Sequence, residues 1–145
     1  MAYELIVKRS LEIKAPASRV WEVLTDPEHT KKYMFGCEVI SDWTPGSPLI
    51  WKGAADGIVY VKGNLVRLEK EWLFEFTVFD PNAGLDDIPA NYSTVTIVLT
   101  PGNGSTTLSV TQGDFAGMAD GENRFMSAEA GWDMVLPKIK EMAEQ

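Results

Sequence analysis

The stretch ENRFMSAEAGWDMVLPKIKEM, residues 122–142, decides the fold class of this chain. Its apolar residues recur at steps of three and four, which is the spacing of one face of an amphipathic helix; they are Phe125, Ala128, Trp132, Val135, Leu136 and Ile139. Asp120 or Asn123 is expected to cap this helix. Pro137 is expected to kink it or to remove one backbone hydrogen bond. The chain therefore ends in one long helix with an apolar face.

Most of the chain before this helix has a different period. Apolar and polar residues alternate there, which is typical of strands that bury one face. Strands are predicted over residues 3–13, 38–40, 49–52, 58–69, 72–79, 92–99 and 106–113. Turn residues separate them, above all Asp56-Gly57 and the run 101–104. A loop is predicted over residues 80–91, where the alternation is interrupted.

Two short helices follow the first predicted strand. Pro16 suits the first turn of a helix, and apolar residues follow it at helical spacing as far as Thr25. Asp26-Pro27 combines a good N-cap with a good first helical residue, so a second helix is predicted to reach Tyr33. The order β-αα-ββββββ-α contains no βαβ repeat. It predicts an α+β domain with an antiparallel sheet, and 145 residues without a linker predict a single domain over 1–145.

Composition limits the function classes. The formal net charge of −8 opposes binding to nucleic acid and to anionic membranes. With one cysteine and one histidine, an intramolecular disulfide is impossible and a structural zinc site is nearly excluded. No signal peptide or transmembrane run is recognisable, so the cytoplasm is the expected compartment. No cofactor and no metal ion is expected.

Several separated segments resemble one known family. They are SDWTPGSPLIWKG (Ser41–Gly53), Asp56-Gly57, Gly63, GWDMVLPKIK (Gly131–Lys140), and APASRVW (Ala15–Trp21) followed by Thr25-Asp26-Pro27. In this order they look like the marks of the activator of heat-shock-protein-90 ATPase homologue family. The resemblance implies a START-like (SRPBCC, helix-grip) fold, in which a curved antiparallel sheet of about seven strands surrounds the C-terminal helix. Members of that superfamily often enclose an apolar cavity and bind hydrophobic ligands, and the eukaryotic namesake stimulates the ATPase of a chaperone.

Aromatic residues are the expected ligand-binding group. Seven of them are expected where the sheet faces the final helix: Trp51, Trp72, Phe74, Phe76, Phe115, Phe125 and Trp132. They either fill the core or line a cavity, and sequence alone leaves both alternatives open. Polar side chains among them would orient a ligand; the candidates are Tyr60, Asn64, Arg67 and Gln112. Arg67 is also expected to pair with Glu69 or Glu75 on the outer surface.

Known catalytic and metal-binding patterns are missing from the sequence. It contains no phosphate-binding glycine loop and no Gly-x-Ser-x-Gly nucleophile elbow. His29 is predicted to be a solvated surface side chain, and Asp86 and Asp87 are predicted to be solvated loop residues rather than calcium ligands. Cys37 is predicted to be a small buried apolar residue. No catalytic residue and no metal ligand is therefore named.

Three hypotheses for function remain. The first is binding of a small hydrophobic molecule, lipid-like or polyketide-like, in a pocket of roughly 300 Å³ or more between the sheet and the final helix. The alternative is a co-chaperone-like interaction domain with an exposed apolar or charged patch and a chaperone as partner. The third is a cyclase- or hydrolase-like enzyme, which needs an acid or base inside the cavity. A monomer or a weak homodimer paired through an edge strand is expected.

Overall fold

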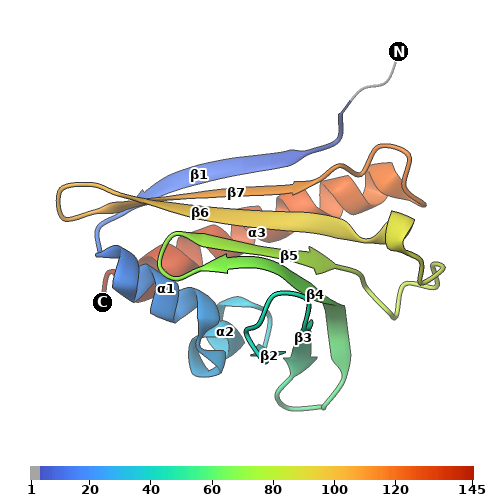
Figure 1. Ribbon diagram of the computed structural model, residues 1–145, viewed down its shortest axis with the longest axis horizontal. Coiled ribbons are helices and arrows are strands. Elements are labelled where there is room, and N and C mark those ends of the chain that lie inside the picture. Colours follow the sequence, from blue (N-terminus) through green and yellow to red (C-terminus); the bar gives the residue numbers. More distant parts are fainter. Residues whose placement is uncertain (1–3) are drawn as a thin grey trace.

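The computed structural model describes residues 4–145 and confirms the α+β helix-grip architecture (Figure 1). Its helices and strands follow in the order β1 (Val7–Ile13), α1 (Ala17–Thr25), α2 (Pro27–Tyr33), β2 (Cys37–Ser41), β3 (Pro48–Gly53), β4 (Val59–Glu69), β5 (Leu73–Val78), the 3₁₀ turn η1 (Pro89–Asn91), β6 (Ser93–Pro101), β7 (Thr106–Gly113) and α3 (Gly121–Ala143). The helices and strands are those that the sequence predicts, and η1 lies in the segment predicted to be a loop. The first strand begins at Val7, later than predicted, and residues 1–3 lie outside the described part of the chain.

The seven strands form one antiparallel sheet in the order β1-β7-β6-β5-β4-β3-β2. The first two strands of the chain are therefore the two edges of the sheet, and helices α1 and α2 connect them. The long helix α3 lies against one face of the sheet (Figure 1). Arg9 of β1 anchors it there, because its Nε donates to Asp133 Oδ1 at 2.8 Å and its Nη2 donates to Glu129 Oε2 at 3.2 Å.

The alternation along the strands decides which side chains face α3. Val95, Ile97 and Leu99 of β6 are all at most 3% exposed, whereas the residues between them are half-buried. Helix α3 meets this face with its predicted apolar positions, of which Trp132, Val135, Leu136 and Ile139 are buried. Burial of this apolar surface is the main favourable contribution to folding.

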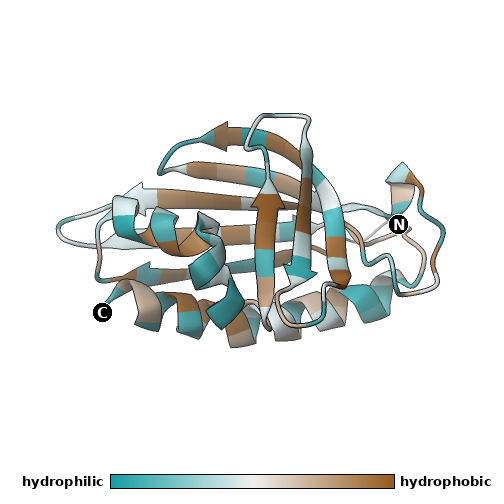
Figure 2. Ribbon diagram, turned by 90° about the horizontal axis from the view of Figure 1, so that it is seen from below, coloured by the Kyte–Doolittle hydropathy of each residue, from teal (hydrophilic) through white to brown (hydrophobic). Residues whose placement is uncertain are grey.

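Helices α1 and α2 lie on the same side of the sheet as α3, close to its C-terminal end (Figure 2). The predicted cap between them is confirmed, because Asp26 Oδ1 accepts a hydrogen bond from the backbone N–H of Glu28 at 2.9 Å. The side chain of Arg19 in α1 ties this pair to α3, since its Nη2 donates to the carbonyl oxygen of Met142 at 3.0 Å. No helix in residues 4–145 is long and apolar enough to cross a membrane.

The start of α3 differs from the prediction. Asp120 stands at the N-cap, but no side chain caps a free backbone N–H there. Its backbone is left-handed at φ 53°, and its carboxylate accepts from Asn123 Nδ2 at 2.8 Å instead. Pro137 is exposed inside the helix, and the helix continues beyond it to Ala143.

Candidate ligand-binding site

Two adjoining chambers between the sheet and helix α3 form the candidate site. The inner chamber has a volume of about 170 Å³ and the outer chamber about 330 Å³. Val61, Val78 and Gln112 belong to the walls of both, so one molecule could extend from one chamber into the other. The sequence predicts roughly 300 Å³; the inner chamber is smaller than that and the outer chamber is close to it.

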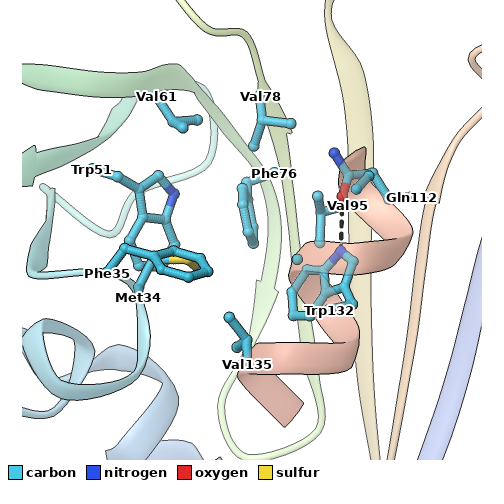
Figure 3. A pocket seen from close by; sticks show the side chains of 12 residues that line it. Met34, Phe35, Trp51, Val61, Phe76, Val78, Val95, Gln112, Trp132 and Val135 are labelled. Atoms are coloured by element: carbon cyan, nitrogen blue, oxygen red, sulfur yellow. Dashed lines mark hydrogen bonds between the residues drawn. The ribbon is translucent and has the colours of Figure 1, made fainter. Parts of the chain in front are cut away.

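The inner chamber is lined almost entirely by carbon. Its sheet wall comes from inward positions of neighbouring strands, and its opposite wall from α3; the lining residues are Met34, Phe35, Trp51, Val61, Phe76, Val78, Val95, Gln112, Ala128, Gly131, Trp132 and Val135. Figure 3 shows Trp51, Met34 and Phe35 on one side of the space and Trp132 and Val135 on the other. Such a chamber favours an uncharged, apolar occupant.

Phe35 stands at the edge of the inner chamber. It belongs to the connection between α2 and β2, and its left-handed φ of 52° lies just before that of Gly36, at 82°. The ring is 58% exposed and lies 5.7 Å from the Lys138 ammonium of α3. Phe35 therefore bridges the gap between the α2–β2 connection and the helix.

Gln112 is the polar residue of the inner chamber. Its Oε1 accepts from Trp132 Nε1 at 2.8 Å, and its Nε2 donates to Ser93 Oγ at 3.0 Å (Figure 3). These two bonds fix the amide, and each of its ends keeps one further hydrogen-bonding capacity. Among the described residues that line this chamber, Gln112 is the one with an amide, hydroxyl or charged group. It can therefore orient a ligand's polar atom.

The outer chamber is more polar. Its walls include Asp80, Asp120, Asn123, Arg124 and Ser127. The Arg124 Nη2 donates to the carbonyl oxygen of Asn91 at 2.6 Å, and its guanidinium lies 5.7 Å from the Phe115 ring. Burial lowers the pKa of Arg124, while the charges of Asp120 and Asp80 act in the opposite direction. Because two carboxylates accompany one guanidinium, this chamber suits a neutral polar group better than an anion.

Asp87 holds the loop that contributes Asp80 and Ala83 to the wall of the outer chamber. It accepts hydrogen bonds from Lys62 Nζ and, at 2.6 Å, from the Tyr92 hydroxyl. These bonds lower the pKa of Asp87, first through Lys62 and then through Tyr92. The Tyr92 ring also stacks on Phe79, with 4.9 Å between the ring centroids. Asp87 is an exposed loop residue, as predicted, and its carboxylate also links the loop to β4.

The predicted aromatic residues do not all meet at one place. Trp51, Phe76 and Trp132 line the inner chamber, and Phe115 lines the outer one. Phe125 packs edge-on against Phe115, with 6.3 Å between the ring centroids. Phe74 is 1% exposed and contacts the rings of Trp21, Trp43 and Phe76, so it fills the core.

Four predicted positions lie away from the chambers and are exposed. Trp72 is 50% exposed, because it belongs to the turn before β5 and the inward alternation starts only after it. Tyr60 is 41% exposed, and its hydroxyl donates to Asp56. Asn64 is exposed, and Arg67 Nε lies 3.8 Å from Glu75 Oε1 on the surface, as predicted. Of the four polar candidates, only Gln112 reaches the site.

The remaining reactive side chains lie elsewhere. Cys37 is free and buried, and burial raises the pKa of its thiol, which fits the predicted small apolar role. His29 differs from its prediction, because its Nδ1 is buried without a hydrogen bond, 3.6 Å from Asp26 Oδ2. The donor atoms of Glu22, Asp26 and His29 lie within 4.8 Å of one another, a cluster that the sequence analysis missed.

The chamber residues that the sequence analysis missed are mostly small or aliphatic: Met34, Phe35, Val61, Val78, Val95, Ala128, Gly131 and Val135. Val95 and Val135 were expected only as apolar positions of a strand and a helix. Ala128 and Gly131 carry the one signal that could have located the chamber, since small residues one turn apart leave space on a helix face.

Comparison with known proteins agrees with the fold. Residues 14–144 match the family described as activator of Hsp90 ATPase homolog 1-like protein. The chain belongs to this family. Its fold places the family within the START-like superfamily, as the sequence motifs imply. No match was found among the curated proteins.

Solved structures extend the comparison. A protein from Cytophaga hutchinsonii is 34% identical, with a TM-score of 0.78, and the match covers 99% of this chain and 97% of that one. An HSP90 activator from Plasmodium falciparum is 16% identical, with a TM-score of 0.75 and 94% of each chain covered. The Aha1 dimer from Colwellia psychrerythraea is 14% identical, with a TM-score of 0.74 and 96% of each chain covered. The last two share the fold.

Proposed function

We propose that this protein binds a small hydrophobic molecule in the inner chamber, with a polar atom of that molecule at Gln112. The observation that carries this proposal is an apolar space of about 170 Å³ with a single fixed amide in its wall. A cavity of about 150 Å³ lined by apolar side chains is large enough to bind benzene. The inner chamber is therefore wide enough for a single ring or a short branched chain.

The inner chamber is open to solvent on one side. A ligand that fills it would displace water from apolar walls and gain van der Waals contacts with them. Ligand binding would in turn stabilise the folded protein by mass action.

The outer chamber suits the other end of such a molecule. Asn123, Ser127 and Arg124 offer donors there, and Asp80 and Asp120 disfavour a negative charge. A lipid-like or polyketide-like molecule with a neutral polar end fits these walls better than a fatty-acid anion. A reaction at this site would have to use Asp80, Asp120 or Arg124, because the described lining of the inner chamber offers no acid or base.

Valine methyl groups provide the test. Val61, Val78, Val95 and Val135 line the inner chamber. In a methyl-labelled sample titrated with indole, the resonances of these four residues should shift, and the thermal midpoint should rise with indole concentration.

Other valines are internal controls: Val20 and Val23 are fully buried in α1, and Val66 is 40% exposed. Their methyl resonances should stay in place. Shifts spread evenly over all valines, or no saturable shift at all, would contradict the proposal. Native mass spectrometry of the purified protein would then show whether a molecule from the expression host co-purifies.

A second candidate function is interaction with a chaperone of the heat-shock-protein-90 type. Exposed apolar side chains favour it: Met126 and Met134 on α3 are 63% and 54% exposed, and the ring of Phe35 is 58% exposed. If these side chains dock on a chaperone, the protein should raise the chaperone's ATPase rate, and Met126→Ser with Met134→Ser should abolish the increase. An unchanged ATPase rate with the unaltered protein would count against this candidate.

A further inference from the structure

Glycines in this chain have identifiable structural reasons at almost every position. Six have left-handed φ values between 71° and 90°, which side chains rarely adopt; they are Gly36, Gly46, Gly57, Gly84, Gly104 and Gly117. Others are required by close packing. A Cβ atom at Gly63 would lie 1.7 Å from the carbonyl oxygen of Thr77, and one at Gly121 would lie 2.2 Å from that of Phe115.

Gly53, Gly102 and Gly113 also have close neighbours. A Cβ atom would lie 2.1 Å from Asp56 Oδ1 at Gly53 and 3.2 Å from Ser105 Oγ at Gly102. At Gly113 it would lie 2.9 Å from the carbonyl oxygen of Leu5, where φ is also 153°. Each of these glycines therefore has a conformational or packing explanation.

Gly131 has neither explanation. It lies in the middle of α3, and a Cβ atom there would meet no atom within 4 Å apart from its chain neighbours and the backbone of its own helix. It is the one glycine of twelve that combines open space with a helical backbone. Glycine weakens a helix interior relative to alanine. The fold would therefore be better served by a side chain at this position.

The open space at Gly131 is the inner chamber. Gly131 lines it together with Ala128 and Val135, one turn before and one turn after. Their small side chains leave the α3 side of the chamber open. The rings of Trp51 and Phe76 line the opposite side, with 6.1 Å between their centroids. The absence of a side chain at Gly131 therefore leaves a slot between the backbone of α3 and the rings of Trp51 and Phe76.

We propose that Gly131 determines which ligands the site accepts, by leaving room for a ring where a side chain would otherwise stand. This inference rests on the proposed function and narrows it: the apolar end of the ligand is an aromatic or alicyclic ring rather than a single alkyl chain. A flat ring placed between Gly131 and the rings of Trp51 and Phe76 makes the offset and edge contacts that aromatic rings prefer. A thin chain would leave part of the slot empty.

The experiment compares Gly131→Ala and Gly131→Leu with Ala130→Leu, the matched control. Ala130 is exposed on the same helix and lies outside the lining of both chambers. Indole is the ring probe and 1-hexanol the chain probe, both followed by the methyl shifts of Val95. Gly131→Leu should weaken indole binding at least tenfold and 1-hexanol binding at most threefold, and Ala130→Leu should change neither.

Thermal unfolding gives an independent readout without any ligand. Gly131→Ala should raise the unfolding midpoint by about 2–4 °C, because alanine strengthens the helix and meets no neighbour. A lower midpoint would overturn the claim that the fold does not need this glycine. Equal losses of indole binding in Gly131→Leu and Ala130→Leu, or no loss in either, would overturn the role in selectivity.

The two proposals fail in different ways. If the unaltered protein binds 1-hexanol but not indole, the ring preference is wrong and hydrophobic ligand binding stands. If it binds neither probe, the proposed function fails, and the inference about Gly131 fails with it.

Discussion

The space between the sheet and helix α3 has a packed end and an open end. At the packed end, helices α1 and α2 insert Leu24 and Tyr33 beside Ile139 of α3, and the residual void there is about 10 Å³. At the open end, along α3 as far as Val135, the chambers measure about 170 and 330 Å³. One sheet and one helix form both ends. The α1–α2 pair makes the difference, because it covers only the part near the C-terminus of α3 (Figure 2).

The two ends therefore have different roles. A void of about 10 Å³ is no larger than one water molecule, so the packed end behaves as an ordinary close-packed core. The open end lacks such packing and holds the polar side chains of the cavity. Stability should reside at the packed end and ligand binding at the open end, and substitutions at the two ends can separate these properties.

The largest effect is expected at the packed end. Leu24 is 1% exposed in α1, and Leu24→Ala removes its contacts with the end of α3. The free energy of unfolding should fall by about 3 kcal/mol, as for other buried leucines replaced by alanine. Urea unfolding measures this change. A loss below about 1 kcal/mol would mean that the packed end is as loose as the open end.

A matched pair of valines tests the contrast directly. Val110 and Val95 lie on the neighbouring strands β7 and β6 and are 1% and 2% exposed, but only Val95 lines the inner chamber. Val110→Ala should lower the free energy of unfolding by about 2 kcal/mol and Val95→Ala by about 1 kcal/mol, because Val95 already lacks partner atoms on its chamber side.

Ligand binding should show the opposite order. Val95→Ala enlarges the inner chamber and should change the affinity for indole, whereas Val110→Ala should leave it unchanged. Equal stability losses together with equal binding would show that the chamber has no separate role.

A smaller effect is expected from the buried hydroxyl of Tyr33. This hydroxyl donates to the carbonyl oxygen of Leu24 at 2.8 Å and joins α2 to α1. Tyr33→Phe should lower the free energy of unfolding by about 1–2 kcal/mol, because the Leu24 carbonyl loses a buried partner. Denaturant unfolding at pH 7 checks this value, and an unchanged midpoint would show that the bond contributes nothing.

The same residue predicts a pH dependence. Burial raises the pKa of Tyr33 far above its ordinary value, so the folded protein keeps this proton while the unfolded chain loses it above about pH 10. Stability should therefore be complete below pH 10 and fall as the pH rises further. The fall should be shallower in Tyr33→Phe. Parallel pH profiles of the two proteins would contradict this assignment.

Local patterns in the sequence predict the fold but only part of the site. The helical period of α3 and the alternation along β6 indicate which face of each element is buried. Both periods follow from the local geometry of the backbone, so they can be identified in the sequence. Whether a buried aromatic side chain fills the core or lines the inner chamber depends instead on where α1 and α2 lie. Phe74 and Phe76 occupy the same face of β5, yet the first is packed against Trp21 of α1 and only the second reaches the inner chamber.

The misplaced residues have local physical reasons. In the sequence, Trp72 continues the alternation of β5. In the structure, β5 begins only at Leu73 and Trp72 belongs to the turn before it, so its side chain is exposed. Gly131 was predicted only as part of a family motif. Its role depends on the open space above it, which is set by the packing of distant segments and leaves no local pattern in the sequence.

The smallest expected effect concerns the loop over the open end. Asp87 ties this loop to Lys62 and Tyr92, whereas Asp86 beside it is exposed and its carboxylate bonds to nothing in residues 4–145. Asp87→Asn should lower the unfolding midpoint by about 1–2 °C, a size typical of exposed ion pairs. Amide hydrogen exchange should accelerate across residues 80–91, and Asp86→Asn should change neither measurement.

The pH dependence of this contact has the opposite sign to that of Tyr33. Lys62 and Tyr92 lower the pKa of Asp87, so its contribution is present above the ordinary aspartate pKa of about 3.9 and is lost as the pH falls below it. The difference between Asp87→Asn and the unaltered protein should therefore shrink as the pH falls below about 3.9. If exchange in the loop is equally fast in both proteins at pH 7, the loop is held by its other contacts, such as the hydrogen bond from Asn82 Nδ2 to the Val59 carbonyl oxygen and the bond from Arg124 to the Asn91 carbonyl oxygen, and not by Asp87.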